Sequence, residues 1–557
     1  MSLPIFSTQA ELFSTAGLAG QLFAPTDRYR LFAQKVYPVL AQTRSQLEGC
    51  YCSDNGRVAI EPVLLLGVSL LQYLEGMPDR QATELLRYHA GWNFALNRQV
   101  GDEVFHPTTL GNFRQRLLDH DLSRSGFQAV LEALIEAGLV ARQSRQRLDS
   151  TQMFGRVSRM SRLDCVRESL RLTLQQLSEQ LPPAQRPQWW SALWEQYVET
   201  QTDYRASLET LTRKMVEAGR AVQQVLGWLA SAPDQELGRA KQARLLARVF
   251  AEQFEVLAQT GEAQPKAQQE LSTQRVQNPH EPEATYASKG KGEHRKEHVG
   301  YKVQVAETVS EAMLAPGEPT RNFIAGMVTH PARESDEAGA LKMQAEQHAL
   351  GLDKPSVQYV DGAYISAEQL VEAQAEGREL IGPAPGAANN NDGRFSSEVF
   401  QVTVEKREAI CPAGHANTQC SRLEEQATGR VSYRFEWDTA TCAACPLRPE
   451  CIHASHKHRS LVVGEHHTVL QARRQEQKTA AFKDRMRHRN AIEGTQSELV
   501  RAHGLRRARY RGLAKTTLQN YFIGAACNVK RWLRRQAWEL RNASLTANLS
   551  GTPARAN

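Results

Sequence analysis

Long apolar runs are missing from this sequence of 557 residues. No stretch approaches the roughly eighteen uninterrupted apolar residues of a membrane-spanning helix, so no membrane span is expected. The first 24 residues have no basic start and include Glu11, which argues against a secretory signal. We therefore expect a protein of the cytoplasm.

Cysteine is scarce as well, with nine residues in the whole chain. An odd number in a chain of this length does not suit a disulfide framework and favours a reducing compartment, with buried or metal-binding thiols. A hydrophobic content of 41% with 23% charged residues is typical of a globular protein. The length predicts three or four domains.

Acidic residues are scarce near the C-terminal end. Residues 471–535 contain 17 Lys and Arg but only 4 Asp and Glu, whereas the net charge of the whole chain is only +7. This local excess suits a polyanion such as a nucleic acid. Glu493 stands in this basic region, four residues after Arg489. It is either half of an ordinary intrahelical ion pair or a ligand of a divalent ion that binds beside phosphate.

The N-terminal part, to about residue 139, reads as helices. Residues 62–74 are apolar nearly all round, which predicts a buried helix. Asp79 is expected to cap the helix that follows, and Thr108 the helix after that. The last helix presents Arg114 and Arg116, so the pair of helices is either a DNA-binding helix-turn-helix or part of a helical bundle with a solvated face.

Two further acids lie beside predicted strands. Asp149 follows a short extended stretch, where it is either functional or an ordinary turn residue. Asp361 follows the strand predicted at 357–360 and precedes Gly362, at the strand end where open α/β sheets place their sites. It could equally be a turn residue. Strands are also predicted at 301–309 and 323–329, and a helix at 336–350.

Four cysteines form a group late in the chain. Cys442 and Cys445 make a CxxC motif, Cys451 follows, and Cys411 lies upstream. This set is compatible with a tetrahedral structural zinc ion, and reduced buried thiols are the alternative. The fourth ligand stays open among Cys411, His415, Cys420 and His453.

Three segments together resemble the acidic motifs of insertion-sequence transposases of the DDE class. They are Leu148-Asp149-Ser150-Thr151, Tyr359-Val360-Asp361-Gly362-Ala363-Tyr364 and Arg489-Asn490-Ala491-Ile492-Glu493-Gly494-Thr495. The basic stretch 503–513 is similar to a segment of one branch of that class, and the N-terminal helices resemble a domain found in many members. In the Y-x2-R-x3-E-x6-K signature of the family, Arg489 and Glu493 fit, but Met486 and Val500 replace the tyrosine and the lysine, and Arg501 follows as a substitute cation.

The resemblance implies an α/β fold with a ribonuclease-H-like catalytic core. We expect a helical N-terminal, DNA-binding-like domain (1–140), the first core strand (141–155), a helical insertion (156–285) and the central strands (286–395). A Cys-rich β insertion (396–470), C-terminal basic helices (471–540) and a disordered tail (541–557) complete the chain. The role of the helical insertion cannot be read from its residues.

The resemblance also implies the chemistry. Asp149, Asp361 and Glu493 would bind two Mg²⁺ (or Mn²⁺) ions for cleavage and strand transfer of DNA. The DNA substrate would be the transposon ends and the target DNA. It would be held by eight arginines: Arg489, Arg501, Arg506, Arg507, Arg509, Arg511, Arg114 and Arg116. A homodimer is expected in the active complex. The rival functions are a catalytically silent DNA-binding protein and a nuclease without strand transfer.

Overall fold

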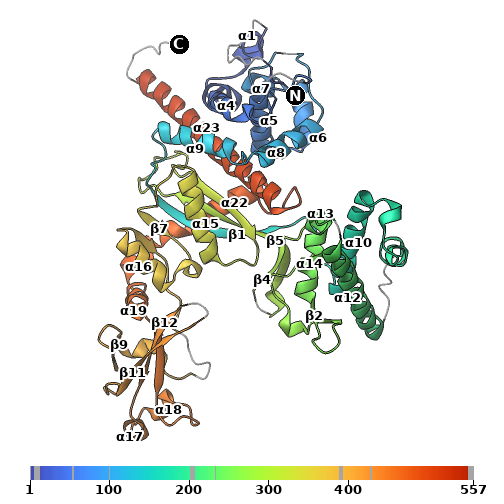
Figure 1. Cartoon of the computed structure of the whole chain (residues 1–557). Coiled ribbons are helices and arrows are strands. Elements are labelled where there is room, and N and C mark those ends of the chain that lie inside the picture. The colour runs from blue at the N-terminus through green and yellow to red at the C-terminus, as the bar shows by residue number, and fades with distance from the viewer. Residues whose placement is uncertain are drawn as a thin grey trace.

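The computed structural model describes residues 2–4, 13–52, 56–99, 101–200, 207–232, 234–290, 292–387, 393–426 and 429–549. A helical N-terminal body sits on a central sheet, a helical arm extends to one side, and a small β body hangs from the opposite end (Figure 1). None of the described helices is long and apolar enough to cross a membrane.

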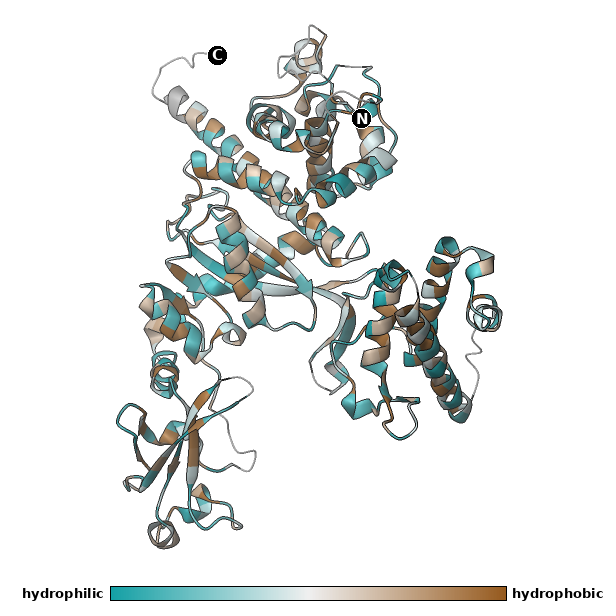
Figure 2. Ribbon diagram, in the orientation of Figure 1, coloured by the Kyte–Doolittle hydropathy of each residue, from teal (hydrophilic) through white to brown (hydrophobic). Residues whose placement is uncertain are grey.

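The N-terminal body consists of short helices: α1 Thr15–Ala19, α2 Arg28–Leu31, α3 Tyr37–Gln42, α4 Arg44–Glu48, α5 Pro62–Glu75, α6 Asp79–Tyr88, α7 Ala90–Ala95, α8 Thr108–Asp119 and α9 Ser125–Glu136. Helix α5 is buried from Pro62 to Tyr73, as its apolar composition predicts (Figure 2). It ends at Gly76, whose φ of 73° is the left-handed conformation that glycine tolerates.

Two helix starts differ from the prediction. Helix α6 begins at Asp79 itself, and the Asp79 carboxylate accepts hydrogen bonds from Gln72 and Arg114 instead of capping the helix. Helix α8 begins at Thr108, whose hydroxyl contacts His106 Nδ1 at 2.9 Å. The Arg114 guanidinium donates to both oxygens of the Asp79 carboxylate, and this two-point pairing engages the carboxylate in place of a cap bond.

The central sheet is mixed. Its strands are β1 Arg145–Phe154, β4 Thr285–Lys289, β5 Lys296–Thr308, β6 Ile324–Pro331, β7 Val357–Tyr359 and β8 Glu379–Ile381. The order across the sheet is β6-β5-β1-β7-β8, and β4 pairs with the other end of β5. Strands β5 and β6 run antiparallel to their neighbours, whereas β7 and β8 run parallel to β1.

Helices cover both faces of this sheet. Helix α15 (Asp336–Ala349) packs on β5 and β6, while α22 (Ile492–His503) and α23 (Leu513–Leu549) contact β1 and β6. Strand β5 is buried from Val299 to Thr308, because both of its faces are covered. One continuous apolar core joins the sheet, α23 and the N-terminal helices, and the Tyr73 and Phe522 rings stack within it at 5.4 Å.

The helical arm lies between β1 and β4 in the chain. It contains α10 Arg162–Gln180, α11 Trp190–Trp194, α12 Leu208–Ser231, α13 Glu236–Arg239 and α14 Lys241–Gln253, with a small hairpin of β2 Phe254–Val256 and β3 Ala263–Pro265. The arm has an apolar core of its own, which includes Leu170, Val222 and Leu246. It therefore does not depend on the central sheet for its packing.

The chain after β8 forms the small β body and then the final helices. The β body holds β9 Gln401–Thr403, β10 Glu408–Ile410, β11 Gln419–Glu424, β12 Val431–Glu436, β13 Ser460–Gly464, α17 Thr439–Ala443 and α18 Arg448–Cys451. Helices α16 (Ala367–Ala375) and α19 (His467–Glu476) pack together between it and the sheet, and α20 Ala480–Arg485 and α21 Arg487–Asn490 follow.

The C-terminal end differs from the expected disordered tail. Helix α23 continues to Leu549, so residues 541–549 are helical, and residues 550–557 lie outside the described part of the chain. The sequence between 541 and 549 contains no glycine or proline, the residues that most disfavour a helix, and both occur soon after Leu549.

Candidate active site

Two of the three candidate acids lie side by side at one edge of the central sheet. Strands β1 and β7 are parallel, and Arg147 pairs with Tyr359. Asp149 lies two residues after Arg147, and Asp361 lies two residues after Tyr359. This register therefore brings the two carboxylates next to each other. The site lies where β7 ends, at the carboxyl edge at which open α/β sheets place functional groups.

The third acid comes from the C-terminal helices. Glu493 is in the first turn of α22, and Arg489 lies one turn earlier, in α21. The Arg489 guanidinium contacts all three carboxylates: its Nη2 is 3.0 Å from Asp149 Oδ2 and 3.4 Å from Asp361 Oδ2, and its Nη1 is 3.7 Å from Glu493 Oε1. Acids 344 positions apart in sequence, as Asp149 and Glu493 are, therefore converge on one guanidinium.

The three carboxylates differ in exposure. The side chain of Asp149 is 12% exposed, whereas those of Asp361 and Glu493 are 53% and 73% exposed. Burial raises the pKa of Asp149, although the charge of Arg489 and the Ser150 N–H, which donates to Asp149 Oδ1 at 2.8 Å, act in the opposite direction. Asp149 is thus the inner member of the group, and the other two acids open toward solvent.

This group fits a divalent cation. Carboxylate oxygens are the hard ligands that Mg²⁺ prefers, and Mg²⁺ keeps several water or phosphate ligands beside one or two carboxylates. The exposed Asp361 and Glu493 leave room for such ligands. Arg489 Nε is buried without a hydrogen-bond partner among the described residues, so the guanidinium has a donor left for a further acceptor.

The raised pKa of Asp149 makes a prediction for stability. Because the folded protein binds the proton more readily than the unfolded chain does, ionisation of Asp149 destabilises the fold, and this cost grows as the pH rises through the window between the ordinary and the raised pKa. Without divalent metal, Asp149→Asn should raise the temperature of the transition that unfolds the central sheet, at pH 7, by about 2–4 °C for each kcal/mol of relief. The gain should shrink as the pH falls, and thermal melts at several pH values in EDTA measure it. A lower melting temperature at pH 7 would contradict this account.

A buried charged network fixes the helices that carry Arg489 and Glu493. Glu307 on β5 accepts from Arg147 Nε on β1 and from Arg531 Nη1 on α23, both at 2.6 Å, and from the Thr495 hydroxyl on α22 at 2.7 Å. Arg147 also donates to the carbonyl oxygen of His488 at 3.0 Å. The network ties α21 and α22 to the sheet, which sets the distance between Glu493 and the two aspartates.

Sequence reasoning missed this network. Glu307 falls within the strand predicted at 301–309, and Arg531 is one of the 17 basic residues of 471–535, so neither stands out in the sequence. Glu307 itself indicates such a network, because a glutamate inside an otherwise apolar strand must have a charged or polar partner when both faces of the strand are buried.

The candidate DNA-binding arginines fall into two groups. Arg501, Arg506, Arg507 and Arg511 are exposed. Arg509 is half-buried: it donates to the Met77 carbonyl at 3.2 Å, and its guanidinium lies 4.6 Å from the centre of the Tyr73 ring. Arg509 therefore has a structural role at the junction with the N-terminal body.

Arg114 requires a correction. Its side chain is only 8% exposed, it forms a two-point ion pair with Asp79, and its guanidinium lies 5.1 Å from the Tyr510 ring centre. A guanidinium committed in this way is not presented to DNA, so Arg114 holds α8 against α6 instead. Its neighbour Arg116 is half-buried, over the Tyr51 ring at 4.5 Å.

The two departures from the family signature occupy packing positions. Met486 packs against a small core that includes Tyr359 and Phe482, and Val500 packs against the large core below the N-terminal helices. Both side chains are half-buried against these cores, which suits an apolar residue at each position. Arg501, next to Val500, is exposed.

The cysteines lie in the small β body. Cys442 and Cys451 are buried and Cys411 and Cys445 are half-buried, with all four thiols free. Burial raises the pKa of the Cys451 thiol, the charge of Arg459 lowers it, and the thiols of Cys442, Cys411 and Cys445 raise it further. In the described part of the chain, no three of these four thiols lie within 4.8 Å of one another. Among the other fourth-ligand candidates, Cys420 packs on the same apolar core and His453 Nδ1 contacts the Ser455 hydroxyl at 2.7 Å.

Among the described residues, one set of three potential metal ligands lies within 4.8 Å, and it is Glu498, His503 and Cys527. The Glu498 carboxylate is already bound by Lys530 at 2.8 Å and Arg531 at 2.9 Å. The charges of Lys530 and Arg531 oppose the binding of a metal ion to the same carboxylate. This set is therefore part of the buried ionic network around Arg531 and not a metal site.

Comparison with known proteins gives two matches to protein families. A family described as transposase DDE domain matches residues 410–533, a range that contains Arg489 and Glu493. A family described as transposase domain (DUF772) matches residues 19–116, in the N-terminal helical body. No curated protein matches the chain. A transposase DDE domain implies a ribonuclease-H-like core, a DNA substrate and the use of divalent metal. Both matches are to transposase domains, one in the N-terminal body and one in the C-terminal part of the chain, and together they support an insertion-sequence DDE transposase.

Proposed function

We propose that this transposase cuts DNA at the ends of its element and joins the resulting 3′-hydroxyl ends to target DNA. The observation that carries the proposal is the convergence of Asp149, Asp361 and Glu493 on a single guanidinium. Such a group of carboxylates at the edge of a mixed sheet suits phosphoryl transfer, because hard oxygen ligands hold divalent ions beside phosphate.

The three acids would hold two Mg²⁺ or Mn²⁺ ions. Bound there, the ions would supply Lewis-acid stabilisation of the attacking and leaving oxygens of an in-line displacement. Asp149 would stay fixed by its backbone contact to Ser150, while Asp361 and Glu493 would complete the site from the solvent side. The ligands act ionised, so the raised pKa of Asp149 predicts weaker metal binding at lower pH.

Arg489 would change partners when substrate arrives. It now neutralises the three acids, and cations bound by the same acids would compete with it for their negative charge. Its planar guanidinium is well suited to a phosphate oxygen pair. We propose that Arg489 turns to the DNA backbone next to the scissile bond, and that the exposed arginines 501, 506, 507 and 511 extend this contact along the strand.

The test uses the DNA that flanks the coding sequence. A plasmid carries both flanks around a resistance marker, the protein is supplied from a second plasmid, and movement of the marker is scored by sequencing the junctions. Joined products at new target sites support the proposal. Cleaved but unjoined ends would identify a nuclease, and binding without cleavage a silent DNA-binding protein.

The proposed substrate also implies the setting of the protein. It would work on the nucleoid of a bacterial cell, in the cytoplasm, and a homodimer would supply one active site for each element end. Size-exclusion chromatography with light scattering, on the protein bound to a flank, tests the dimer.

We also propose a structural zinc ion in the small β body, held by Cys442, Cys445, Cys451 and Cys411. The support is the CxxC spacing of Cys442 and Cys445 and the placement of all four free cysteines in one small β body. Zinc binding would have to draw the thiols together, because no three of them lie within 4.8 Å in the described part of the chain. Protein purified without chelators should contain about one zinc ion per chain by elemental analysis. Cys442→Ser should lower this content and unfold the β body, whereas Cys50→Ser, outside that body, should not. Less than half an equivalent of zinc in the unchanged protein would contradict the site.

A further inference from the structure

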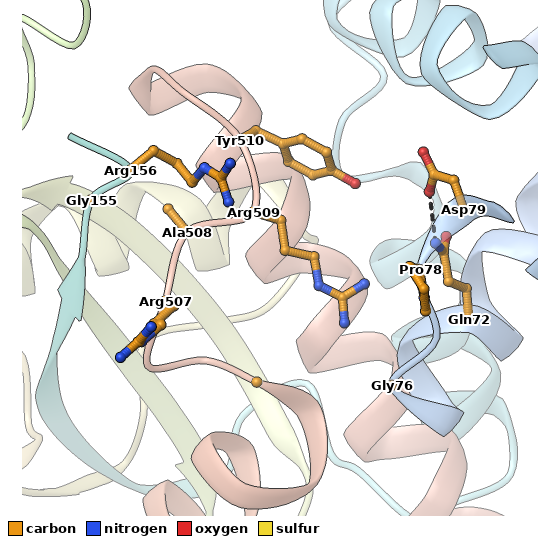
Figure 3. Close-up of a pocket in the computed structure, with 11 residues that line it drawn as sticks. Gln72, Gly76, Pro78, Asp79, Gly155, Arg156, Arg507, Ala508, Arg509 and Tyr510 are labelled. Carbon is orange, nitrogen blue, oxygen red and sulfur yellow. Dashed lines mark hydrogen bonds between the residues drawn. The ribbon is translucent and has the colours of Figure 1, made fainter. Parts of the chain in front are cut away.

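A cleft lies at the junction of the sheet, the N-terminal body and the segment between α22 and α23. One hollow of 690 Å³ is bounded by Gln72 and Asp79 on one side and by Arg156, Arg509 and Tyr510 on the other (Figure 3). A second hollow of 440 Å³ shares Gly155, Arg156 and Arg507 with the first. The two hollows therefore adjoin along the end of β1.

An exposed aromatic ring borders the second hollow. Phe154, the last residue of β1, is 43% exposed, and its ring meets the His298 ring edge-on at 5.6 Å. Burial, helped by the charge of Arg506, lowers the pKa of His298, so this neighbour is a neutral ring at pH 7. The backbone of Phe154 is paired with the segment 506–508, because its N–H donates to Arg506 O and its carbonyl accepts from Ala508 N–H, each at 2.9 Å. A large apolar ring is thus held rigidly at the surface.

The surroundings of this ring are basic. Arg156, Arg159 and Arg507 line the hollow, and among the described residues no carboxylate lies within 4 Å of the Arg156 or Arg507 guanidinium. The acid in the lining, Glu297, is paired with Arg295 at 3.0 Å. The cleft thus combines positive charge with an exposed aromatic face.

The buried Glu281 holds the walls of the cleft together. Its Oε2 accepts from the backbone N–H of Arg156 at 2.9 Å, and its Oε1 accepts from the Tyr301 hydroxyl at 2.8 Å and from Gly512 N–H at 3.3 Å. One fully buried carboxylate therefore fixes the exit of β1 against the start of α23. The cleft is a built feature of the fold and not a gap between loosely packed parts.

We infer that this cleft binds an unpaired nucleotide of a DNA strand, with the base stacked on Phe154 and the adjoining phosphates on Arg156 and Arg507. Aromatic rings beside a cationic groove are the features that bind single-stranded nucleic acid, since every base offers a flat face to stack. Phe154 lies five residues beyond Asp149 on the same strand, which is about 17 Å at 3.3–3.4 Å per residue. The site deepens the proposed function, on which it rests for its DNA substrate, by adding a contact to an unstacked base near the cleavage point.

The test measures binding of fluorescein-labelled dT20 and of a 20-base-pair duplex to the full-length protein in EDTA, by fluorescence anisotropy. Phe154→Ala should weaken dT20 binding about tenfold or more, because stacking is lost, and change duplex binding by less than about twofold. Phe154→Leu, which keeps apolar volume without the aromatic face, should show the same selective loss, and Phe154→Trp should retain binding. Leu208→Ala, which removes an exposed apolar side chain from the arm, is the control.

Charge is tested separately. Arg156→Gln and Arg507→Gln should each reduce the salt dependence of dT20 binding by about one unit of slope. Unchanged dT20 affinity in both Phe154→Ala and Phe154→Leu, or an equal loss for the duplex, would overturn the inference. Since EDTA removes the metal needed for cutting, selective dT20 binding in a protein that fails to move its element would leave this site standing and refute only the proposed function.

Discussion

Asp149→Ala, Asp361→Ala and Glu493→Ala are each expected to slow Mg²⁺-dependent nicking of element-end DNA by more than about a hundredfold. Loss of a residue that merely supports a metal ligand already costs roughly 10- to 100-fold, so loss of a ligand itself should cost more. The three acids come from β1, from the end of β7 and from α22, and each contacts Arg489. The substrate is a supercoiled plasmid that carries the coding sequence with its flanks.

The three losses should not add. Because the acids act as one unit, a variant that lacks two of them should be little slower than a variant that lacks one. Glu236→Ala, at an acid that is 75% exposed in the arm, is the matched control and should nick at the normal rate. Normal nicking by any one of the three alanine variants would remove that residue from the site.

Glu307→Ala is expected to destabilise the packing of α22 and α23 on the sheet by about 3–5 kcal/mol, the range for breaking a buried ion pair from one side. The Glu307 side chain is 1% exposed, and its removal leaves Arg147 (6% exposed) and Arg531 (5% exposed) without their shared carboxylate. Glu498 still pairs with Arg531, so Arg147 is left with the larger deficit.

Hydrogen exchange measures this effect locally, which suits a chain of several bodies that does not unfold in one step. Peptides from α22 should exchange faster by more than about a hundredfold, as expected for a loss of 3 kcal/mol or more. Peptides from the helical arm, which has its own core, should not change, and Glu236→Ala should leave both regions as they are. Unchanged protection of α22 would show that Glu307 does not position Glu493.

Local sequence patterns predicted the strand that leads to Asp361 and several of the elements around it. Alternating and buried apolar runs predicted strands at 301–309, 323–329 and 357–360, close to the observed β5, β6 and β7, and a helix at 336–350, close to the observed α15. The position of Asp361 after a strand and before glycine is a local feature. It could therefore be read without knowledge of the fold.

The rest depends on contacts between distant segments. No local pattern shows that β1 lies between β5 and β7, or that the backbone of Arg507 forms a parallel bridge with Phe154. The partner of Arg114 is Asp79 on another helix, so an arginine expected to face DNA is instead buried. In the same way, the i,i+4 spacing allowed a pair between Arg489 and Glu493 to be foreseen, but the contacts of Arg489 with Asp149 and Asp361 appear only once α21 is packed on the sheet.

The most direct test of the central claim, that these three acids bind the catalytic ions, exchanges each for cysteine. A thiolate is a softer ligand that binds Mg²⁺ poorly and tolerates Mn²⁺ better. Asp149→Cys, Asp361→Cys and Glu493→Cys should fail to nick the plasmid in Mg²⁺ and recover nicking in Mn²⁺, whereas the unchanged protein should nick in both. Nicking by the cysteine variants in Mg²⁺ at the rate of the unchanged protein would contradict the account.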